Sequence, residues 1–293
     1  MPYDHRKTRA RTGALVACAA LTVLTALTGC GAGSQAAAPG TPDAKTTQSP
    51  ASTPAPPGAS STTPPPASAL PLAGRTIVVD PGHNPGNFQH SREINQKVDV
   101  GTHRKECDTT GTSTSTDYTE AAFTLDVSHR LRDLLKAQGA KVVLTHDADR
   151  PFGPCIDERA RIGNSARADA AVSVHADGSG TGNRGFHVIV PAQVSSGAAD
   201  TTRIVGPSRD LGEDIARHFA RATGTAPANY LSAGTGLDVR DDLGGLNLST
   251  VPKVFVECGN MRDPKDAALL TNAAWRQKAA QGIADGIGTY LKG

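Results

Sequence analysis

The sequence is poor in aromatic side chains and in net charge. Only 4% of its 293 residues are Phe, Trp or Tyr, and 30 basic side chains are nearly balanced by 28 acidic ones, which leaves a formal net charge of +2. Proteins that bind nucleic acids depend on basic surfaces and, for single strands, on aromatic platforms for the bases. The composition therefore argues against a nucleic-acid partner, and we expect none.

Two common catalytic signatures are also missing. The chain contains no Gly-x-x-x-x-Gly-Lys segment, whose backbone would cradle phosphates, and no Gly-x-Ser-x-Gly elbow, which would expose a nucleophilic serine. The sequence therefore gives no support for a P-loop nucleotide hydrolase, and it argues against a serine hydrolase.

The one long apolar run lies near the N-terminus. Residues 13–27 are largely apolar and follow four basic side chains within the first eleven residues, which is typical of an export signal and short for a membrane span of about 20 residues. The run ends in Leu-Thr-Gly-Cys, which resembles a bacterial lipobox. We expect residues 1–30 to be a lipoprotein signal peptide, with Cys30 acylated at the outer face of the cell membrane. An ordinary cleaved signal with an incidental cysteine is the alternative.

A second segment lacks the composition of a folded domain. Residues 31–74 consist mainly of Pro, Ala, Ser, Thr and Gly and contain ten of the twenty prolines. Such a segment cannot bury a core, and we expect it to be a disordered tether that reaches on the order of 100 Å. The folded domain is then predicted over residues 75–293, where it would act on a target away from the lipid surface.

Three cysteines fall within this predicted domain. Cys107 and Cys155 lie in polar, loop-like sequence, and we expect them to form a disulfide in an oxidising compartment. Cys258 follows a hydrophobic strand-like segment and is expected to be a small buried side chain. Three free thiols are the alternative.

Strand-like and helix-like segments alternate along the predicted domain. The strand-like segments are residues 76–80, 141–145, 169–174, 185–190 and 251–256. The helix-like segments are residues 118–138, 156–168, 207–223 and 275–292, and a long polar loop covers residues 81–117. This alternation predicts a single α/β domain in which a central, mostly parallel twisted sheet is flanked by helices on both faces.

Three polar side chains follow the ends of predicted strands. His83 comes after Ile-Val-Val-Asp-Pro-Gly, His175 after Ala-Val-Ser-Val and Glu257 after Val-Phe-Val. Ligand sites of open α/β sheets lie at the carboxyl ends of strands, so we expect these side chains to meet there. The alternatives are a hydrogen-bonded turn or core histidine and a structural salt bridge. Asp80 is a natural acceptor for a ring N–H of His83.

An oxygen ligand would complete the chemistry of these residues. Two imidazoles and one carboxylate form the open zinc site of a hydrolase, and a second carboxylate beside it would serve as general base. Glu120 is a candidate ligand at the start of a predicted helix, but it equally fits a capping box with Asp117. Asp117 and Glu106 are rival ligands.

The remaining histidines carry weaker signals. His187 lies within a strand-like segment, where it either faces the crevice to steer substrate or serves packing alone. His129, His146 and His218 are expected at the surface.

Taken together, residues 75–292 resemble the zinc-dependent N-acetylmuramoyl-L-alanine amidases of the amidase type 3 family. The matching segments, in order, are Val-Val-Asp-Pro-Gly-His ending at His83, the acidic helix start at Glu120, residues 144–145, 157–159 and 164–166, Ala-Val-Ser-Val-His-Ala around His175, and residues 251–259 around Glu257. These enzymes cleave the amide between the lactyl group of N-acetylmuramic acid and the first L-alanine of the peptidoglycan stem. The long loop with its cysteine resembles the actinobacterial branch.

The resemblance implies roles for the candidate residues. His83, Glu120 and His175 would be zinc ligands, and Glu257 the catalytic base. It also implies a peptidoglycan substrate, Zn²⁺ as cofactor and action outside the membrane in the cell wall, and we expect a monomer. The alternatives are a zinc peptidase or deacetylase acting on other wall bonds, and a non-catalytic wall-binding lipoprotein.

The sequence also departs from the family pattern in places. Residues 84–86 are Asn-Pro-Gly instead of beginning with a Gly-Gly pair, Asp177 stands where Asn is common, and Asn-Met at 260–261 replaces an aromatic residue. These positions line the crevice walls, so they bear on the substrate subsites more than on the reaction.

Overall fold

The computed structural model describes residues 70–293. The predicted signal peptide with Cys30 and nearly all of the predicted tether lie outside the described residues. Within residues 70–293, none of the helices combines the length and apolar character needed to span a membrane.

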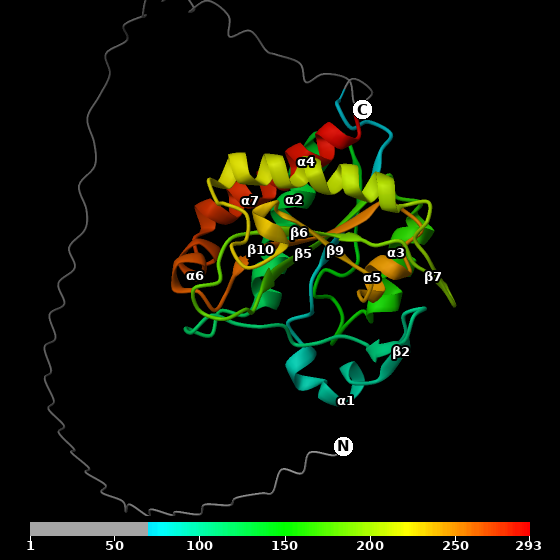
Figure 1. Cartoon of the computed structure of the whole chain (residues 1–293), viewed down its shortest axis with the longest axis horizontal. Coiled ribbons are helices and arrows are strands. Elements are labelled where there is room, and N and C mark those ends of the chain that lie inside the picture. The colour runs from blue at the N-terminus through cyan, green and yellow to red at the C-terminus, as the bar shows by residue number, and fades with distance from the viewer. Residues whose placement is uncertain (1–69) are drawn as a thin grey trace, which may run out of the picture. The chain divides into compact units, whose positions relative to one another are not determined.

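A six-stranded sheet forms the centre of the domain (Figure 1). Across the sheet the strands are β4 (Lys141–Leu144), β1 (Thr76–Pro81), β5 (Ala170–Asp177), β10 (Lys253–Asn260), β6 (His187–Pro191) and β9 (Leu237–Arg240). Neighbouring strands are parallel except β10 and β6, which are antiparallel. The predicted α/β class with a mostly parallel sheet is therefore confirmed.

Helices cover both faces of this sheet. The helices α2 (Glu120–Ala137), α4 (Val205–Thr223) and α7 (Ala273–Tyr290) lie on one face, and α3 (Ile156–Ala166) and α5 (Gly244–Asn247) lie on the other (Figure 1). Strand β1 shows how the alternation of side chains serves both layers: Ile77 and Val79 belong to the large core under α2, α4 and α7, whereas Val78 belongs to a smaller cluster on the opposite face.

The segment between β1 and α2 contains more structure than the long polar loop that its sequence predicts. It holds the short helical turns η2 (Asn87–Gln89) and α1 (Ser91–Ile94) and an antiparallel hairpin of β2 (Lys97–Asp99) and β3 (Arg104–Glu106). These elements are too short to be read from hydrophobic periodicity. Further short elements are β7 (Ser195–Ser196), β8 (Ala199–Asp200), η3 (Ser232–Gly234) and α6 (Pro264–Leu270).

Two other parts differ from the sequence prediction. Strand β9 does not appear in the sequence prediction; it is an edge strand of four residues, two apolar and two charged, and it pairs with β6 alone. Leu72, which falls in the predicted tether, is buried in the large core, and its backbone N–H donates to the carbonyl of Gln138 over 2.8 Å. The packed chain therefore begins before Arg75, because Leu72 is apolar and has a place in the core.

Candidate metal centre

The candidate site lies near the carboxyl ends of β1, β5 and β10. These three strands are parallel neighbours, so their carboxyl ends share one edge of the sheet. Glu257 of β10 pairs with His175 of β5, and His83 follows β1 by two residues. The structure thus brings together the three residues for which the sequence predicts a common location.

His83 is held in an unusual backbone conformation. Its φ is 61°, in the left-handed region that non-glycine residues rarely adopt. The preceding Gly82 lies directly against His175: a Cβ atom built on Gly82 would stand 2.4 Å from Cε1 of that ring. The turn after β1 therefore places the two imidazoles edge to face, with ring centroids 5.0 Å apart.

Glu120 joins the two histidines from the first turn of α2. Its Oε2 lies 3.1 Å from Nε2 of His83, and its Oε1 lies 3.0 Å from Nδ1 of His175. The backbone N–H groups of Thr112 and Ala176 also donate to this carboxylate, over 3.0 and 3.2 Å. The carboxylate is therefore fixed on four sides and points into the site.

The capping-box alternative for Glu120 is wrong. The helix begins at Glu120 itself, and the cap is Thr119, whose side chain accepts from the N–H of Ala122. Asp117 is exposed, with a φ of 62°, and does not cap the helix. The other rival ligand, Glu106, pairs with Lys97 on the hairpin.

The three side chains can hold one metal ion. One donor atom each from His83, Glu120 and His175 lies within 4.8 Å of the others, and this is the one such group among residues 70–293. Two nitrogens and one carboxylate oxygen are the donor set of catalytic zinc sites, which keep a further position open. Because Nδ1 of His83 faces the carbonyl of Thr109 over 3.1 Å, Nε2 is the nitrogen left toward the site. The residues therefore fit zinc.

Burial and neighbouring charges shift the pKa values of His83 and Glu120 in opposite directions. Burial opposes the charged form of His83, but the carboxylates of Glu120 and Asp108 outweigh it and raise the pKa of His83 to about 10. Burial likewise opposes the charge on Glu120, yet His83 and His175 hold the pKa of this carboxyl well below its usual range. The arrangement is suited to a bound cation, which would take the place of the proton on the imidazole.

Glu257 has a different environment from Glu120. Its Oε2 is buried and has no hydrogen-bond partner. Burial raises the pKa of Glu257 well above its usual range, and the charges of Glu120 and Asp177 add to the effect. A carboxylate with a buried, unpaired oxygen beside a candidate metal site can exchange protons with a reactant, which is the property a general base needs.

A buried ionic network lies beneath the site, and its centre is Asp80. The Asp80 carboxylate accepts from Thr145, Arg159 and Ser173 over 2.6, 2.8 and 2.9 Å and from Lys253 over 3.3 Å. The expectation that Asp80 accepts from the ring of His83 is therefore wrong. The cause is that the positive charges of the buried Arg159 and Lys253 both lie against Asp80 and occupy its carboxylate.

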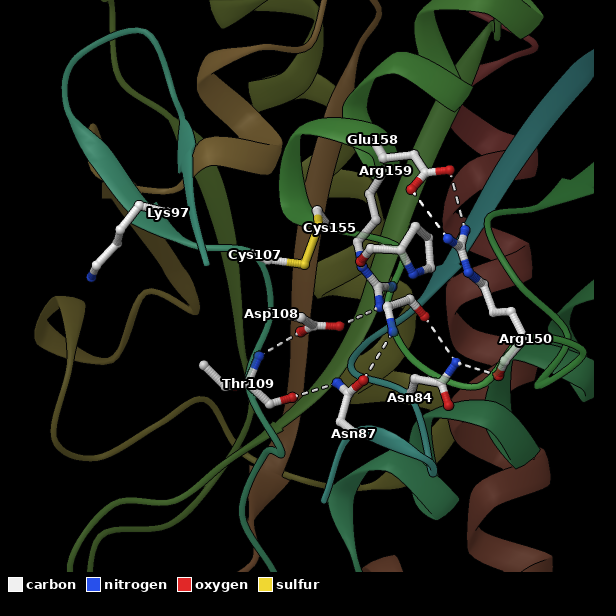
Figure 2. The surroundings of a disulfide bond; sticks show 12 residues. Asn84, Asn87, Lys97, Cys107, Asp108, Thr109, Arg150, Cys155, Glu158 and Arg159 are labelled. Carbon is white, nitrogen blue, oxygen red and sulfur yellow. Dashed lines mark hydrogen bonds and ion pairs between the residues drawn. A yellow bond between two sulfur atoms is a disulfide. The ribbon is translucent and has the colours of Figure 1, made fainter. Parts of the chain in front are cut away.

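The segment that does contact the ring of His83 is tied down by a disulfide. Cys107 and Cys155 are bonded, as their sequence context suggests, and they join the end of the hairpin to the start of α3. Asp108 and Thr109 follow this bond and lie beside the turn that carries Asn84 and Asn87 (Figure 2). Cys258 is free and buried.

Two other sequence predictions concern histidines. His146 is buried, not exposed, because its Nε2 faces the carbonyl of Pro81 over 3.0 Å. His187 is buried in the strand position that pairs with Glu257, and its Nδ1 has no hydrogen-bond partner. Its ring stands edge-on to Tyr230, whose hydroxyl donates to Asp177 over 2.6 Å. The carboxylate of Asp177 thus accepts a hydrogen bond from Tyr230.

The site opens into a cleft of about 290 Å³ that contains all four predicted residues. Its walls include Arg240, Leu243 and Phe255, and the ring of Phe255 stacks on His175 at a centroid distance of 5.2 Å. Sequence reasoning missed Arg240 because it lies at the end of the unexpected strand β9. The available sign in the sequence was that Arg240 ends a short strand-like segment and is followed by two aspartates.

Comparisons with known proteins agree on one family. Residues 77–289 match the family model described as N-acetylmuramoyl-L-alanine amidase. The chain is 40% identical over 228 residues to an N-acetylmuramoyl-L-alanine amidase of Mycobacterium tuberculosis, covering 77% of this chain and 90% of that protein. It is 26% identical to the N-acetylmuramoyl-L-alanine amidase LytC of Bacillus subtilis, but it spans only 36% of LytC.

Solved structures give the same result. The crystal structure of the N-acetylmuramyl-L-alanine amidase Ami1 from Mycobacterium smegmatis superposes with a TM-score of 0.69 at 39% identity, covering 75% of this chain and 98% of that one. The apo form of Ami1 from Mycobacterium abscessus has the same score and identity and is covered completely.

Proposed function

This chain belongs to the family of N-acetylmuramoyl-L-alanine amidases, and we propose that it carries out its amide hydrolysis with a zinc ion held by His83, Glu120 and His175 and with Glu257 as general base. The bond cleaved is the amide between N-acetylmuramic acid and the L-alanine of the peptidoglycan stem. The observation that carries the residue assignment is the convergence of two imidazoles and one carboxylate, with a second, unpaired carboxylate in the same cleft.

The proposed division of labour follows from the environments of the two glutamates. Zinc, when bound, polarises a carbonyl and lowers the pKa of water, which makes amide hydrolysis possible at neutral pH. Glu120 is anionic and fully hydrogen-bonded, so it binds and does not transfer protons. Glu257 accepts the proton of the attacking water at its unpaired Oε2 and delivers it to the departing amine of L-alanine. Its raised pKa lets it hold that proton between the two steps.

The remaining contacts keep this geometry fixed. Gly82 permits the approach of the two imidazoles, and Phe255 stacks on His175. Because Gly82 directly follows β1 and Phe255 belongs to β10, and these strands lie on either side of β5, the two histidine ligands are positioned by the centre of the sheet.

We further propose that the enzyme is a monomeric lipoprotein anchored at the outer face of the cell membrane. The supports are the lipobox-like sequence that ends at Cys30 and the Pro-rich composition of residues 31–74. The tether would let the domain, which spans roughly residues 70–293, reach the wall while Cys30 remains in the membrane.

Digestion of purified muramyl peptides tests the proposal. The protein is incubated with substrate with and without a zinc chelator, and the products are analysed by mass spectrometry. The expected result is release of intact stem peptides, abolished by chelator and restored by Zn²⁺. Shortened stems would indicate a peptidase, loss of acetyl groups a deacetylase, and unchanged activity in chelator would exclude the metal centre.

A further inference from the structure

The ring of His83 is supported by a short backbone segment, residues 107–109, which we call the strap. The ring Nδ1 of His83 faces the backbone carbonyl of Thr109 over 3.1 Å, and the hydroxyl of Thr109 lies at the same distance. A histidine that binds zinc through one nitrogen is oriented by the hydrogen bond of the other. The strap therefore occupies the position from which the ring of His83 can be oriented.

Asp108 stiffens the strap from within. Its Oδ1 accepts from the backbone N–H of Thr109 over 2.8 Å and lies 3.7 Å from Nδ1 of His83. Its Oδ2 accepts from Nη2 of Arg159 over 2.9 Å. The carboxylate is buried, so this contact is an ion pair inside the protein and fixes the direction in which Asp108 points.

The same guanidinium also fixes the backbone on both sides of Gly82. Nη1 of Arg159 donates to the carbonyl of Pro81 over 2.6 Å, and Nη2 donates to the carbonyl of His83 over 2.9 Å. One buried side chain thus bonds to the backbone that carries the ligand and, through Asp108, to the strap that orients the ligand's ring. The two parts cannot move independently while Arg159 stays in place.

The disulfide joins the strap to the helix that carries Arg159. Cys107 is the first strap residue, and Cys155 is the residue just before α3. The backbone N–H of Ile156 donates to the carbonyl of Cys107 over 2.7 Å, next to the covalent bond. Figure 2 shows the disulfide, Asp108 and Arg159 side by side, with Thr109 at the far end of the strap.

We propose that the strap is the positioning element of the His83 ligand and that Asp108, Arg159 and the Cys107–Cys155 disulfide act together to keep it in place. The inference rests on the proposed zinc function of His83. Its consequence is that the metal affinity depends on a disulfide whose sulfurs do not bind the metal. Loss of an outer partner of a metal-bound histidine weakens binding by about 10- to 100-fold.

The test compares zinc dissociation constants, measured by competition with a chromophoric chelator, for the full chain and three variants. The double variant Cys107→Ser/Cys155→Ser removes the disulfide, and Asp108→Asn removes the charge that pairs with Arg159. Lys97→Ala is the matched control, because Lys97 lies on the hairpin that leads into the strap, pairs with half-buried Glu106 and points away from the strap (Figure 2). Melting of the metal-free proteins is measured in parallel.

The proposal expects the zinc dissociation constant to rise about 10- to 100-fold in the first two variants and to stay native in Lys97→Ala. Excess zinc should restore the hydrolysis rate of both strap variants, because the base is untouched. Native affinity in the double serine variant or in folded Asp108→Asn overturns the proposal. If the double serine variant does not fold, Asp108→Asn, which keeps the disulfide, decides alone. If Asp108→Asn also fails to fold, Thr109→Val is measured instead. Native zinc affinity in Thr109→Val then overturns the proposal, and a roughly 10-fold loss supports it.

Failure of the underlying function looks different. If the native chain and His83→Ala bind zinc equally, His83 is not a ligand, and the proposed function fails with the strap. If the native chain binds zinc and His83→Ala does not, but the strap variants bind normally, only the positioning role is lost.

Discussion

Glu257 and His175 occupy paired positions on the parallel strands β10 and β5, so the candidate base stands beside a candidate zinc ligand. On the other side of β10, Glu257 pairs with His187 of β6. The base is thus set in the sheet between two histidine-bearing strands, one that belongs to the site and one that is packed beneath Tyr230. Its place is fixed by backbone hydrogen bonds, which a side-chain substitution leaves intact.

Replacement of Glu257 by Gln is therefore expected to remove the base without disturbing the metal site. The amide keeps the shape of the side chain but cannot accept the proton of water. We expect the turnover number to fall by about 10²- to 10⁴-fold, with native zinc content by metal analysis. Near-native turnover would exclude the base role, and loss of zinc would show that Glu257 belongs to the ligand set.

The same substitution is expected to stabilise the metal-free protein at neutral pH. The folded-state pKa of Glu257 is raised above its ordinary value, so the folded protein binds more protons than the unfolded chain in the window between the two values. The free-energy cost of the buried negative charge of Glu257 is absent at pH values below the ordinary carboxyl pKa. It grows as pH rises through this window and is fully present above the folded-state pKa.

Thermal melting across pH checks this sign. Metal-free Glu257→Gln should melt above the native chain at pH 7, by about 2–4 °C for each kcal/mol relieved, and the difference should shrink toward pH 4. A variant that melts lower than the native chain at pH 7 would show that burial does not penalise the charge of Glu257.

Sequence patterns located part of this site because strand ends are visible in the sequence. The apolar runs before His83, His175 and Glu257 end abruptly, and parallel pairing brings those ends together. Glu120 was different: its position near a helix start fitted a cap equally well, and only the family resemblance favoured a ligand. The structure excludes the capping role of Glu120 because the helix begins two residues later than predicted, with Thr119 as cap.

The supporting network was much less predictable. Lys253 begins a largely apolar strand and Arg159 lies inside a helix, and nothing local in the sequence shows that both reach Asp80. Asp80 was therefore assigned to the wrong partner. Arg159 and Lys253 are separated from Asp80 by 79 and 173 positions along the chain, whereas hydrophobic periodicity reports only on near neighbours.

Glu120 is expected to be indispensable for the metal. Glu120→Gln keeps the side-chain volume but loses the charge that faces both histidines over about 3 Å. We expect zinc affinity to fall by more than the roughly 100-fold that loss of an outer partner costs. Glu106→Gln is the control, since this rival acid pairs with Lys97 on the hairpin, and it should bind zinc normally. Equal affinities in the two variants would contradict the assignment of Glu120.

Gly82→Ala is expected to damage the site by crowding alone. The new Cβ would lie 2.4 Å from the ring of His175, closer than real Cβ atoms approach, so the ring or the turn before His83 must move. We expect weaker zinc binding and a loss of stability of about 1–3 kcal/mol, the usual cost of overpacking. Gly163→Ala in α3 is the matched control, because its Cβ would meet Val251 at an ordinary 3.8 Å and alanine favours a helix. Zinc titration and thermal melting of both variants decide the matter: a Gly82→Ala protein that binds zinc as tightly as Gly163→Ala would show that the two imidazoles do not need this close approach.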